Sequence, residues 1–148
     1  MHGYNSAMKF LMMPAALLLL PCLALRADSP ARLTVAPPDT AHYDFGTRTC
    51  GDPSPLTHTF RLRNGGAGPV TLLRVPTSCH CTEAMPEGGK SLPLTLAPGA
   101  TLPLVVTVNP ARFGPGPVSK TVWVYMRDGS TPALTLEVTG TLKAVKAP

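Results

Sequence analysis

Charged and aromatic side chains are scarce in this chain. Only 14% of its 148 residues are charged, whereas an average soluble domain has roughly 25%, and aromatic residues make up 5%. Proline is abundant instead, with 18 residues, and its missing backbone donor works against long helices and favours short strands with many turns. The length allows one compact domain and excludes a dinucleotide-binding half joined to a substrate domain.

Sequence patterns of catalysis are missing as well. The chain has no Gly-x-Ser-x-Gly elbow and no glycine-rich phosphate loop, and its acidic residues are not paired as in glycoside hydrolases. Its formal charge of +5 is scattered along the sequence, which is a poor match for the phosphates of nucleic acid. We therefore expect neither an enzyme nor a protein that binds nucleic acid.

The N-terminal stretch has the pattern of a secretory signal peptide. A basic start at Lys9 is followed by an apolar run that reaches Leu25, and small residues close it. We expect residues 1–27 to form the signal peptide, with cleavage after Ala24 or after Ala27. The run is shorter than the roughly 18–20 apolar residues of a membrane anchor.

Export determines whether the protein contacts a membrane and whether its compartment is oxidising. The mature chain would contact a membrane only if the leader stayed uncleaved or if Cys22 carried a lipid. Pro21 disfavours the lipid, because it is not the small residue that precedes a lipidated cysteine. We expect a periplasmic or extracellular protein in an oxidising compartment.

Short apolar segments separated by turns follow the leader. Residues 28–41 form a proline-rich lead-in around an apolar piece at 33–35, and residues 143–148 form a basic tail. Between them the candidate strands cover 42–45, 56–63, 70–75, 91–96, 102–108, 118–126 and 134–138. This pattern predicts an all-β fold, a β-sandwich of about seven to eight antiparallel strands over residues 42–142.

Seven apolar residues occupy in-phase positions on these strands and should be buried. They are Leu62, Leu104, Val106, Val122, Val124, Leu136 and Val138. Trp123 is out of phase with its two valine neighbours, so we expect it on an outer face, as an anchor for a partner or simply beside a neighbouring strand.

Several short motifs carry a family resemblance. They are Tyr43-Asp44-Phe45-Gly46, the segment from His58 to Gly66, Ser78-Cys79-His80-Cys81-Thr82, Pro98-Gly99, the segment from Val106 to Pro110, and Val138-Thr139-Gly140. The chain resembles the immunoglobulin-like domains of the hydin and major-sperm-protein group, and within it a secreted bacterial branch of unknown function. The resemblance covers about residues 42–141 and implies an immunoglobulin-like β-sandwich and export, but no reaction. The family usually has Gly where this chain has His80, and it has no counterpart of Cys50.

Three cysteines remain once the leader is removed. An odd number in an exported protein indicates a free thiol, an intermolecular bridge or a metal ligand. Because antiparallel neighbours alternate in direction, the connections at 46–55, 77–90 and 109–117 should share one end of the sandwich. The side chains expected at that end are Cys50, Cys79, His80, Cys81 and Met85, with His58 near it.

The first hypothesis for the cysteines is a structural disulfide. It would join Cys50 to Cys79 or to Cys81 and leave the third thiol free. Such a bridge closes a loop of about 30 residues and stabilises the fold by roughly 3–4 kcal/mol. Exported cysteines usually pair, so this is the hypothesis that we favour.

The second hypothesis is a metal site for copper or zinc. In an extended stretch the thiols of Cys79 and Cys81 lean from one face, and soft thiolates suit Cu(I) or Zn. Cys50 or His58 would be the third ligand, and His80 would join if the loop is irregular. His58 is also in phase with buried positions, however, which favours a hydrogen-bonded residue at the edge of the core.

The third hypothesis is thiol–disulfide exchange by a bridge between Cys79 and Cys81 themselves. No thioredoxin-like strand and helix accompany the pair to lower a thiol pKa. Taken together, the patterns indicate an exported, non-catalytic module that binds a protein partner and needs no cofactor. The alternative is a protein that handles copper or zinc through Cys79, His80 and Cys81.

The intact mass of the exported chain tests the leader. We expect a mature N-terminus at Leu25 or Asp28, because cleavage follows Ala24 or Ala27, and Cys22 should be absent. A diacylglycerol adduct on Cys22 would instead establish a lipoprotein, and retention of residues 1–27 would contradict cleavage.

Overall fold

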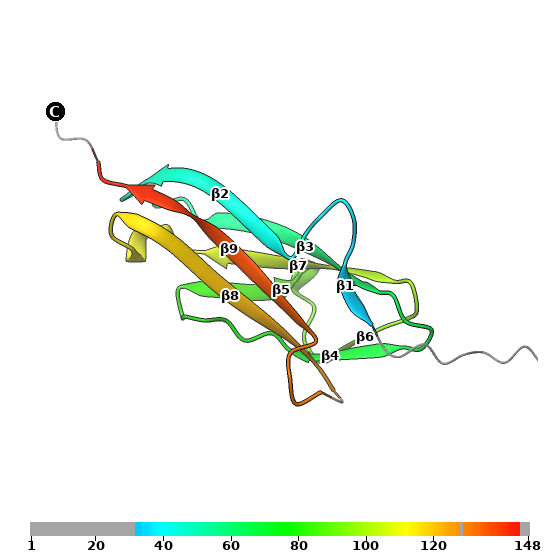
Figure 1. The fold of residues 1–148 in the computed structure, drawn as a ribbon. Coiled ribbons are helices and arrows are strands. Elements are labelled where there is room, and N and C mark those ends of the chain that lie inside the picture. Colours follow the sequence, from blue (N-terminus) through cyan, green and yellow to red (C-terminus); the bar gives the residue numbers. More distant parts are fainter. Residues whose placement is uncertain (1–31, 128, 146–148) are drawn as a thin grey trace, which may run out of the picture.

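The computed structural model describes residues 32–127 and 129–145, which fold into two β-sheets (Figure 1). One sheet has the strand order β1 (Leu33–Val35), β3 (Leu56–Asn64), β7 (Thr101–Val108) and β5 (Thr82–Pro86). The other has the order β2 (His42–Thr49), β9 (Leu134–Lys143), β8 (Gly116–Met126), β4 (Val70–Arg74) and β6 (Leu94–Leu96). Two 3₁₀ helices, η1 (Glu87–Gly89) and η2 (Pro110–Arg112), lie in the connections. Within the described ranges no helix is long and apolar enough to cross a membrane.

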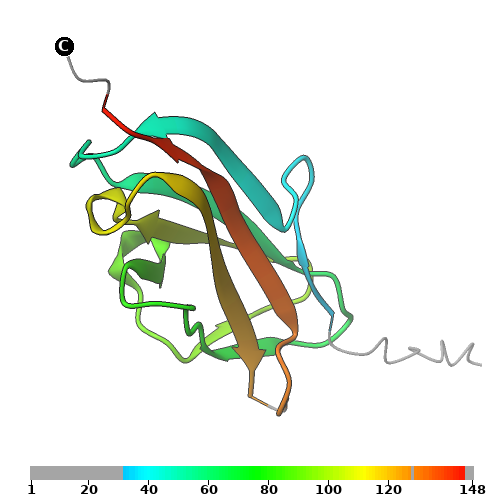
Figure 2. The ribbon, with the colours of Figure 1, turned by 60° about the vertical axis from the view of Figure 1, so that its left-hand side comes forward.

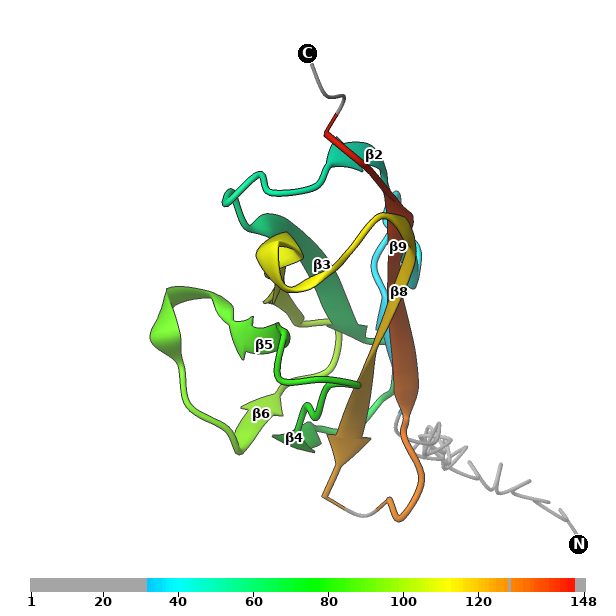
Figure 3. The same cartoon turned by 90° about the vertical axis from the view of Figure 1, so that its left-hand side faces the viewer.

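The two sheets pack face to face around one apolar core. Figure 2 looks onto β2, β9 and β8 lying side by side, and Figure 3 shows β8 and β9 opposite strands of the other sheet. Alternate residues of β7, from Leu102 to Val108, point into the core and are buried. All seven core residues predicted from the sequence are buried, and the predicted β-sandwich is confirmed.

The N-terminal segment contributes to both sheets. β1 pairs with the end of β3, the chain turns through 36–41, and β2 then joins the other sheet beside β9. The β2–β9 pair is parallel, whereas we expected antiparallel neighbours throughout, because the chain changes sheets here without reversing its direction. The lead-in at 28–41 therefore contains a strand, and the sandwich begins before residue 42. The leader at 1–27 lies outside the described residues.

Strand β5 lies in the segment 77–90, which the sequence analysis assigned to a loop. Its residues show no apolar alternation, since Thr82 and Pro86 point inward and Glu83 and Met85 point outward. The strand forms because β7 offers it a partner along its whole length. This addition brings the described part of the chain to nine strands.

A bulge in β2 turns Phe45 into the core. The pairing with β9 shifts its register between Asp44 and Thr47, and the carboxylate of Asp44 accepts a 2.8 Å hydrogen bond from the amide of Gly46. The ring of Phe45 lies against Gly140, where a Cβ atom would collide with it. Glycine at residue 140 is thus required by the ring that covers it.

Asn64 is a buried polar residue at the end of β3. Its side-chain amide donates hydrogen bonds to the carbonyls of Gly68, at 2.8 Å, and Leu96, at 3.1 Å. Its side-chain carbonyl accepts a 2.9 Å bond from the amide of Gly66. One side chain therefore ties the turn after β3 to the end of β6 in the other sheet.

The backbone of Asn64 is satisfied as well. Its amide donates to the carbonyl of Ala100 at 3.0 Å, and its carbonyl accepts from the amide of Gly99 at 2.8 Å. The turn between β6 and β7 is thereby held against the same residue. All of its polar groups are paired, which is the condition under which a buried polar side chain is stable.

Replacing Asn64 with Ala should lower the free energy of unfolding by about 3 kcal/mol, because three backbone groups lose their partner and a cavity opens. Urea unfolding of the mature chain measures the loss. The control is Asn109→Ala: Asn109 is exposed and accepts one 3.1 Å bond from Ala111 at the start of η2, so its loss should be about 1 kcal/mol. Equal losses would contradict the importance assigned to Asn64.

Candidate functional site

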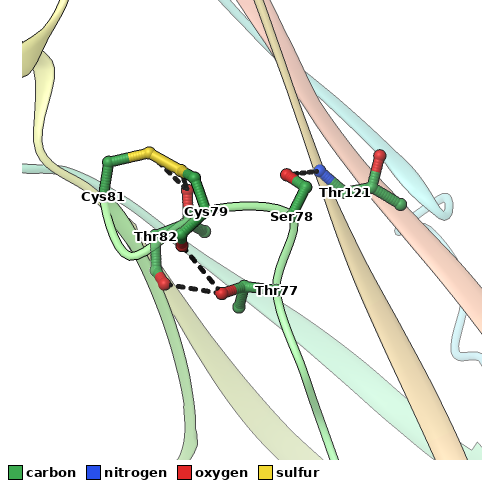
Figure 4. Close-up of a disulfide and its surroundings, with 6 residues drawn as sticks. All are labelled: Thr77, Ser78, Cys79, Cys81, Thr82 and Thr121. Carbon is green, nitrogen blue, oxygen red and sulfur yellow. Dashed lines mark hydrogen bonds between the residues drawn. A yellow bond between two sulfur atoms is a disulfide. The ribbon is translucent and has the colours of Figure 1, made fainter.

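The cysteine pair lies in the connection between β4 and β5. Cys79 and Cys81 form a disulfide, and their Cα atoms are 5.2 Å apart (Figure 4). The amide of Thr82 donates a 3.2 Å hydrogen bond to the carbonyl of Cys79, which closes a turn. The two cysteines are thus joined across a turn, whereas the extended stretch expected from the sequence would hold their Cα atoms about 6.6 Å apart.

Hydrogen bonds hold the backbone of this turn from two sides. The hydroxyl of Thr77 donates to the carbonyls of Cys79, at 3.0 Å, and Thr82, at 2.9 Å. From the end of β7, the amide of Asn109 donates to the carbonyl of Cys81 at 2.9 Å. The turn is therefore fixed by contacts that involve no sulfur atom.

The disulfide sits where the chain crosses from one sheet to the other. Ser78 is bonded twice to Thr121 of β8. Its amide donates to the Thr121 carbonyl at 2.9 Å, and its hydroxyl accepts from the Thr121 amide at 3.0 Å (Figure 4). Thr77 forms a β-bridge with Val122 of the same strand. Three residues after the first cysteine, Thr82 begins β5 in the opposite sheet. The disulfide therefore lies within the segment that connects the two sheets.

Cys50 is the free thiol among the described cysteines, so the bridge from Cys50 that we favoured is not the one formed. Its amide donates to the carbonyl of Lys143 at the end of β9, at 2.8 Å. The cysteine pair is held instead beside Thr121, whose partner on β9 is Glu137. Glu137 and Lys143 are separated by about 20 Å of strand, while a disulfide needs Cα atoms within about 7 Å.

Thr82 places a buried hydroxyl beside the disulfide. The residue is 5% exposed, and its Oγ1 lies 3.4 Å from Sγ of Cys79 and 3.8 Å from Sγ of Cys81. Disulfide sulfurs carry no hydrogen, so the hydroxyl is the donor in both contacts. Within the described part of the chain its Oγ1 has no other hydrogen-bond partner.

His80 is exposed at the tip of the turn and borders two hollows. One hollow, of about 170 Å³, is lined by Thr77, Ser78, Cys79 and His80. The other, of about 270 Å³, includes Cys81 and Thr82 together with the charged residues Glu83 and Arg112. Both cysteines are thus reached from solvent.

The predicted metal ligands are not brought together. Among residues 32–127 and 129–145, no three His, Cys, Asp or Glu side chains are placed to hold a metal ion. The sulfurs of Cys79 and Cys81 are bonded to each other, so neither is the thiolate that binds metals. Cys50 follows β2 and is bonded to Lys143 at the end of β9, and His58 on β3 is paired with Val106 of β7, so neither adjoins His80.

His58 packs at the edge of the core. Its ring stacks on Tyr43, with centroids 3.8 Å apart, and meets the ring of Phe60 edge-on at 4.6 Å. Burial lowers the pKa of His58, and the charge of Asp39, which is ion-paired with Arg61 at 2.9 Å, opposes this shift to a smaller degree. The residue occupies the edge-of-core position expected for it, but the expected hydrogen bond is not found: within the described residues its ring is held by stacking alone.

A second surface is the outer face of the four-stranded sheet. One row across it consists of Met85 on β5, Val105 on β7 and Thr59 on β3. Met85 is 49% exposed. A hollow of about 200 Å³ is lined by Met85, Val105 and the residues of η1. A wider hollow of about 530 Å³ lies beside Thr59, Pro103 and Arg61. This face carries the most exposed large apolar side chain of the described strands.

Trp123 lies on the outer face of the other sheet, as predicted. Its neighbours Val122 and Val124 are buried, whereas Trp123 is half-buried opposite Thr135 of β9. Its amide donates to the carbonyl of Pro76 at 3.0 Å. It lies beside neighbouring strands, the simpler of the two expectations.

Two features of these surfaces were not predicted from the sequence. The hydroxyl of Thr82 was overlooked, although its position directly after the cysteine pair was a usable signal. The row through Met85 and Val105 could not be seen, because it exists only once β5 is paired with β7.

The comparison with protein families decides the identity. Residues 38–142 match the family described as "Protein of unknown function (DUF1573)". The chain belongs to this family. No curated protein matches it. The membership agrees with the coarser part of the resemblance, an immunoglobulin-like domain family of unknown function.

Solved structures share the fold at low identity. A protein of unknown function from Porphyromonas gingivalis W83 has a TM-score of 0.60 at 22% identity, over 80% of this chain and 50% of that chain. A family 123 glycoside hydrolase from Clostridium perfringens has a TM-score of 0.57 at 10% identity, over 74% and 24%. The ASH/PapD-like domain of human CEP192 has a TM-score of 0.47 at 11% identity, over 96% and 99%. The chain thus spans about half the length of the first of these, and its own two packed sheets agree with the predicted immunoglobulin-like β-sandwich.

Removal of the disulfide should change stability little. The double variant Cys79→Ser/Cys81→Ser should lose about 1.5 kcal/mol of unfolding free energy, since the bridge closes a loop of only three residues. Urea unfolding measures the loss, with Cys50→Ser as the control that leaves the bridge intact. A loss of about 4 kcal/mol or more, as expected for a long loop, would contradict the hydrogen-bonded turn.

Proposed function

We propose that this chain is an exported, non-catalytic binding module that engages a protein partner through the outer face of its four-stranded sheet. The observation that carries the proposal is the row of Met85, Val105 and Thr59 with the hollows beside it. Met85 is exposed, and the apolar residues Val105 and Pro103 beside it are half-buried. Apolar surface that gathers on one face of a small domain marks an interaction surface.

The composition of the face supports a protein as the partner. Its middle is formed by Met85, Val105 and Pro103, and the charged residues Glu83 and Arg61 lie around them. An apolar centre within a polar rim is the usual arrangement of a protein–protein interface. Methionine suits such a centre because its flexible, polarisable side chain adapts to the surface that it meets.

Export belongs to the same proposal. The signal-peptide pattern of residues 1–27 supports secretion to the periplasm or the cell envelope. We also include in this proposal the finer part of the family resemblance, the likeness to hydin domains. The lack of catalytic motifs in the sequence supports a module that catalyses no reaction and needs no cofactor. Handling of copper or zinc by Cys79, His80 and Cys81 remains the alternative, and it would require the disulfide to be reduced first.

Capture from an envelope extract of the producing organism tests the binding face. The immobilised mature chain should retain a specific protein, and Met85→Glu should weaken that retention by at least about tenfold, because a charge then replaces an apolar anchor. The matched control is Leu73→Glu: Leu73 is 41% exposed on β4 of the other sheet. Both variants should have the same midpoint of urea unfolding as the wild type.

Two outcomes would contradict this proposal. One is retention that Met85→Glu leaves unchanged, and the other is retention that Leu73→Glu abolishes equally. Binding should also survive Cys79→Ser/Cys81→Ser, because the turn lies outside the row through residue 85.

A further inference from the structure

We propose that Cys79 and Cys81 are a redox-active pair, which passes its disulfide to a dithiol of another exported protein. The exchange is stoichiometric, with one disulfide passed by each chain, so it adds to the non-catalytic partner binding proposed above and does not rest on it. Three features point to it: the bridge closes only its own turn, solvent reaches it, and a buried hydroxyl donates to its sulfurs.

The turn keeps its shape when the bridge opens. The carbonyls of Cys79 and Cys81 accept hydrogen bonds from the amides of Thr82 and Asn109, and the hydroxyl of Thr77 adds a third bond. Because no sulfur takes part in them, these bonds survive reduction and keep the two thiols adjacent. A pair held in place in this way opens and closes with little rearrangement of the backbone.

The hydroxyl of Thr82 favours the opened form of the bridge. It donates to neutral sulfurs in the disulfide, and a thiolate is a much stronger acceptor for the same bond. Its Oγ1 is nearer to Sγ of Cys79, at 3.4 Å, than to Sγ of Cys81, at 3.8 Å. Cys79 is therefore the leaving sulfur, and Cys81 is the one attacked.

Access to Cys81 agrees with this direction. The hollow of about 270 Å³ beside it also includes His80 and Arg112, and one acid, Glu83. The guanidinium of Arg112 attracts the thiolate of an approaching partner, since thiolates are favoured next to cationic side chains. The surface around Cys81 thus offers both room and charge for the attacking group.

The exchange proceeds in two balanced steps. A thiolate of the partner attacks Sγ of Cys81, the bond between the two sulfurs breaks, and Cys79 leaves as a thiolate. The partner's second thiolate then attacks the partner's own sulfur in this mixed disulfide, and Cys81 leaves. The partner loses two electrons and two thiol protons and gains a disulfide, and the pair takes them up as a dithiol.

A synthetic peptide with two cysteines is the probe for the exchange. For this test Cys50 of the mature chain is replaced (Cys50→Ser), so that any thiols of the chain come from reduction of the pair. The reaction is run without oxygen. We expect one peptide disulfide to form for each chain, with two new alkylatable thiols on the chain. The control, Cys79→Ser/Cys81→Ser on the same background, should leave the peptide reduced. The proposal is overturned if no peptide disulfide forms even when the peptide is in large excess over the chain. It is also overturned if the control variant oxidises the peptide as much as the chain with the intact pair does.

Substitution of Thr82 tests its part as a positioning residue. Thr82→Val keeps the shape and removes the hydroxyl, so reduction of the bridge by the peptide should slow by roughly tenfold. Thr82→Ser keeps the hydroxyl and should react within about twofold of the wild type. Urea midpoints of the two variants show whether the turn remains folded. Equal rates in both variants, or slowing in both, would contradict donation by the hydroxyl.

Discussion

The side chain of Asn64 joins a strand of one sheet to backbone groups that border strands of the other. Its own strand, β3, lies in the four-stranded sheet, while Leu96 ends β6 in the five-stranded sheet and Gly68 precedes β4 there. Polar groups buried between two sheets without partners would oppose their packing. The single residue removes that penalty at one end of the sandwich and so fixes how the two sheets meet.

The alternation of apolar residues was enough to predict which strand residues face the core, because burial alone decides this. Val106 and Val122 are buried because every second residue of an inner strand faces the core. Strand β5 and the cysteine pairing depend instead on hydrogen-bond partners that are distant in the sequence. Thr82–Pro86 is a strand because β7 pairs with it, and Cys50 is kept from the pair by its bond to Lys143.

The motifs that carry the family resemblance are contacts between distant segments. Phe45, from the first motif, covers Gly140 in the last. The amide of Asn109, from the segment at the end of β7, bonds to the carbonyl of Cys81 in the cysteine motif. The resemblance therefore reports how the sandwich is closed, and this is why it predicted the fold and carried no prediction of a reaction.

The strands at the margins are β1 and β5 in the four-stranded sheet and β2 and β6 in the five-stranded sheet. All four are short or irregular: β1 and β6 have three residues each, β2 is bulged, and β5 ends at Pro86. Such margins are poor templates for strand addition by another chain. Neighbouring molecules are thereby directed to the faces of the sheets, and the domain is protected against edge-to-edge aggregation.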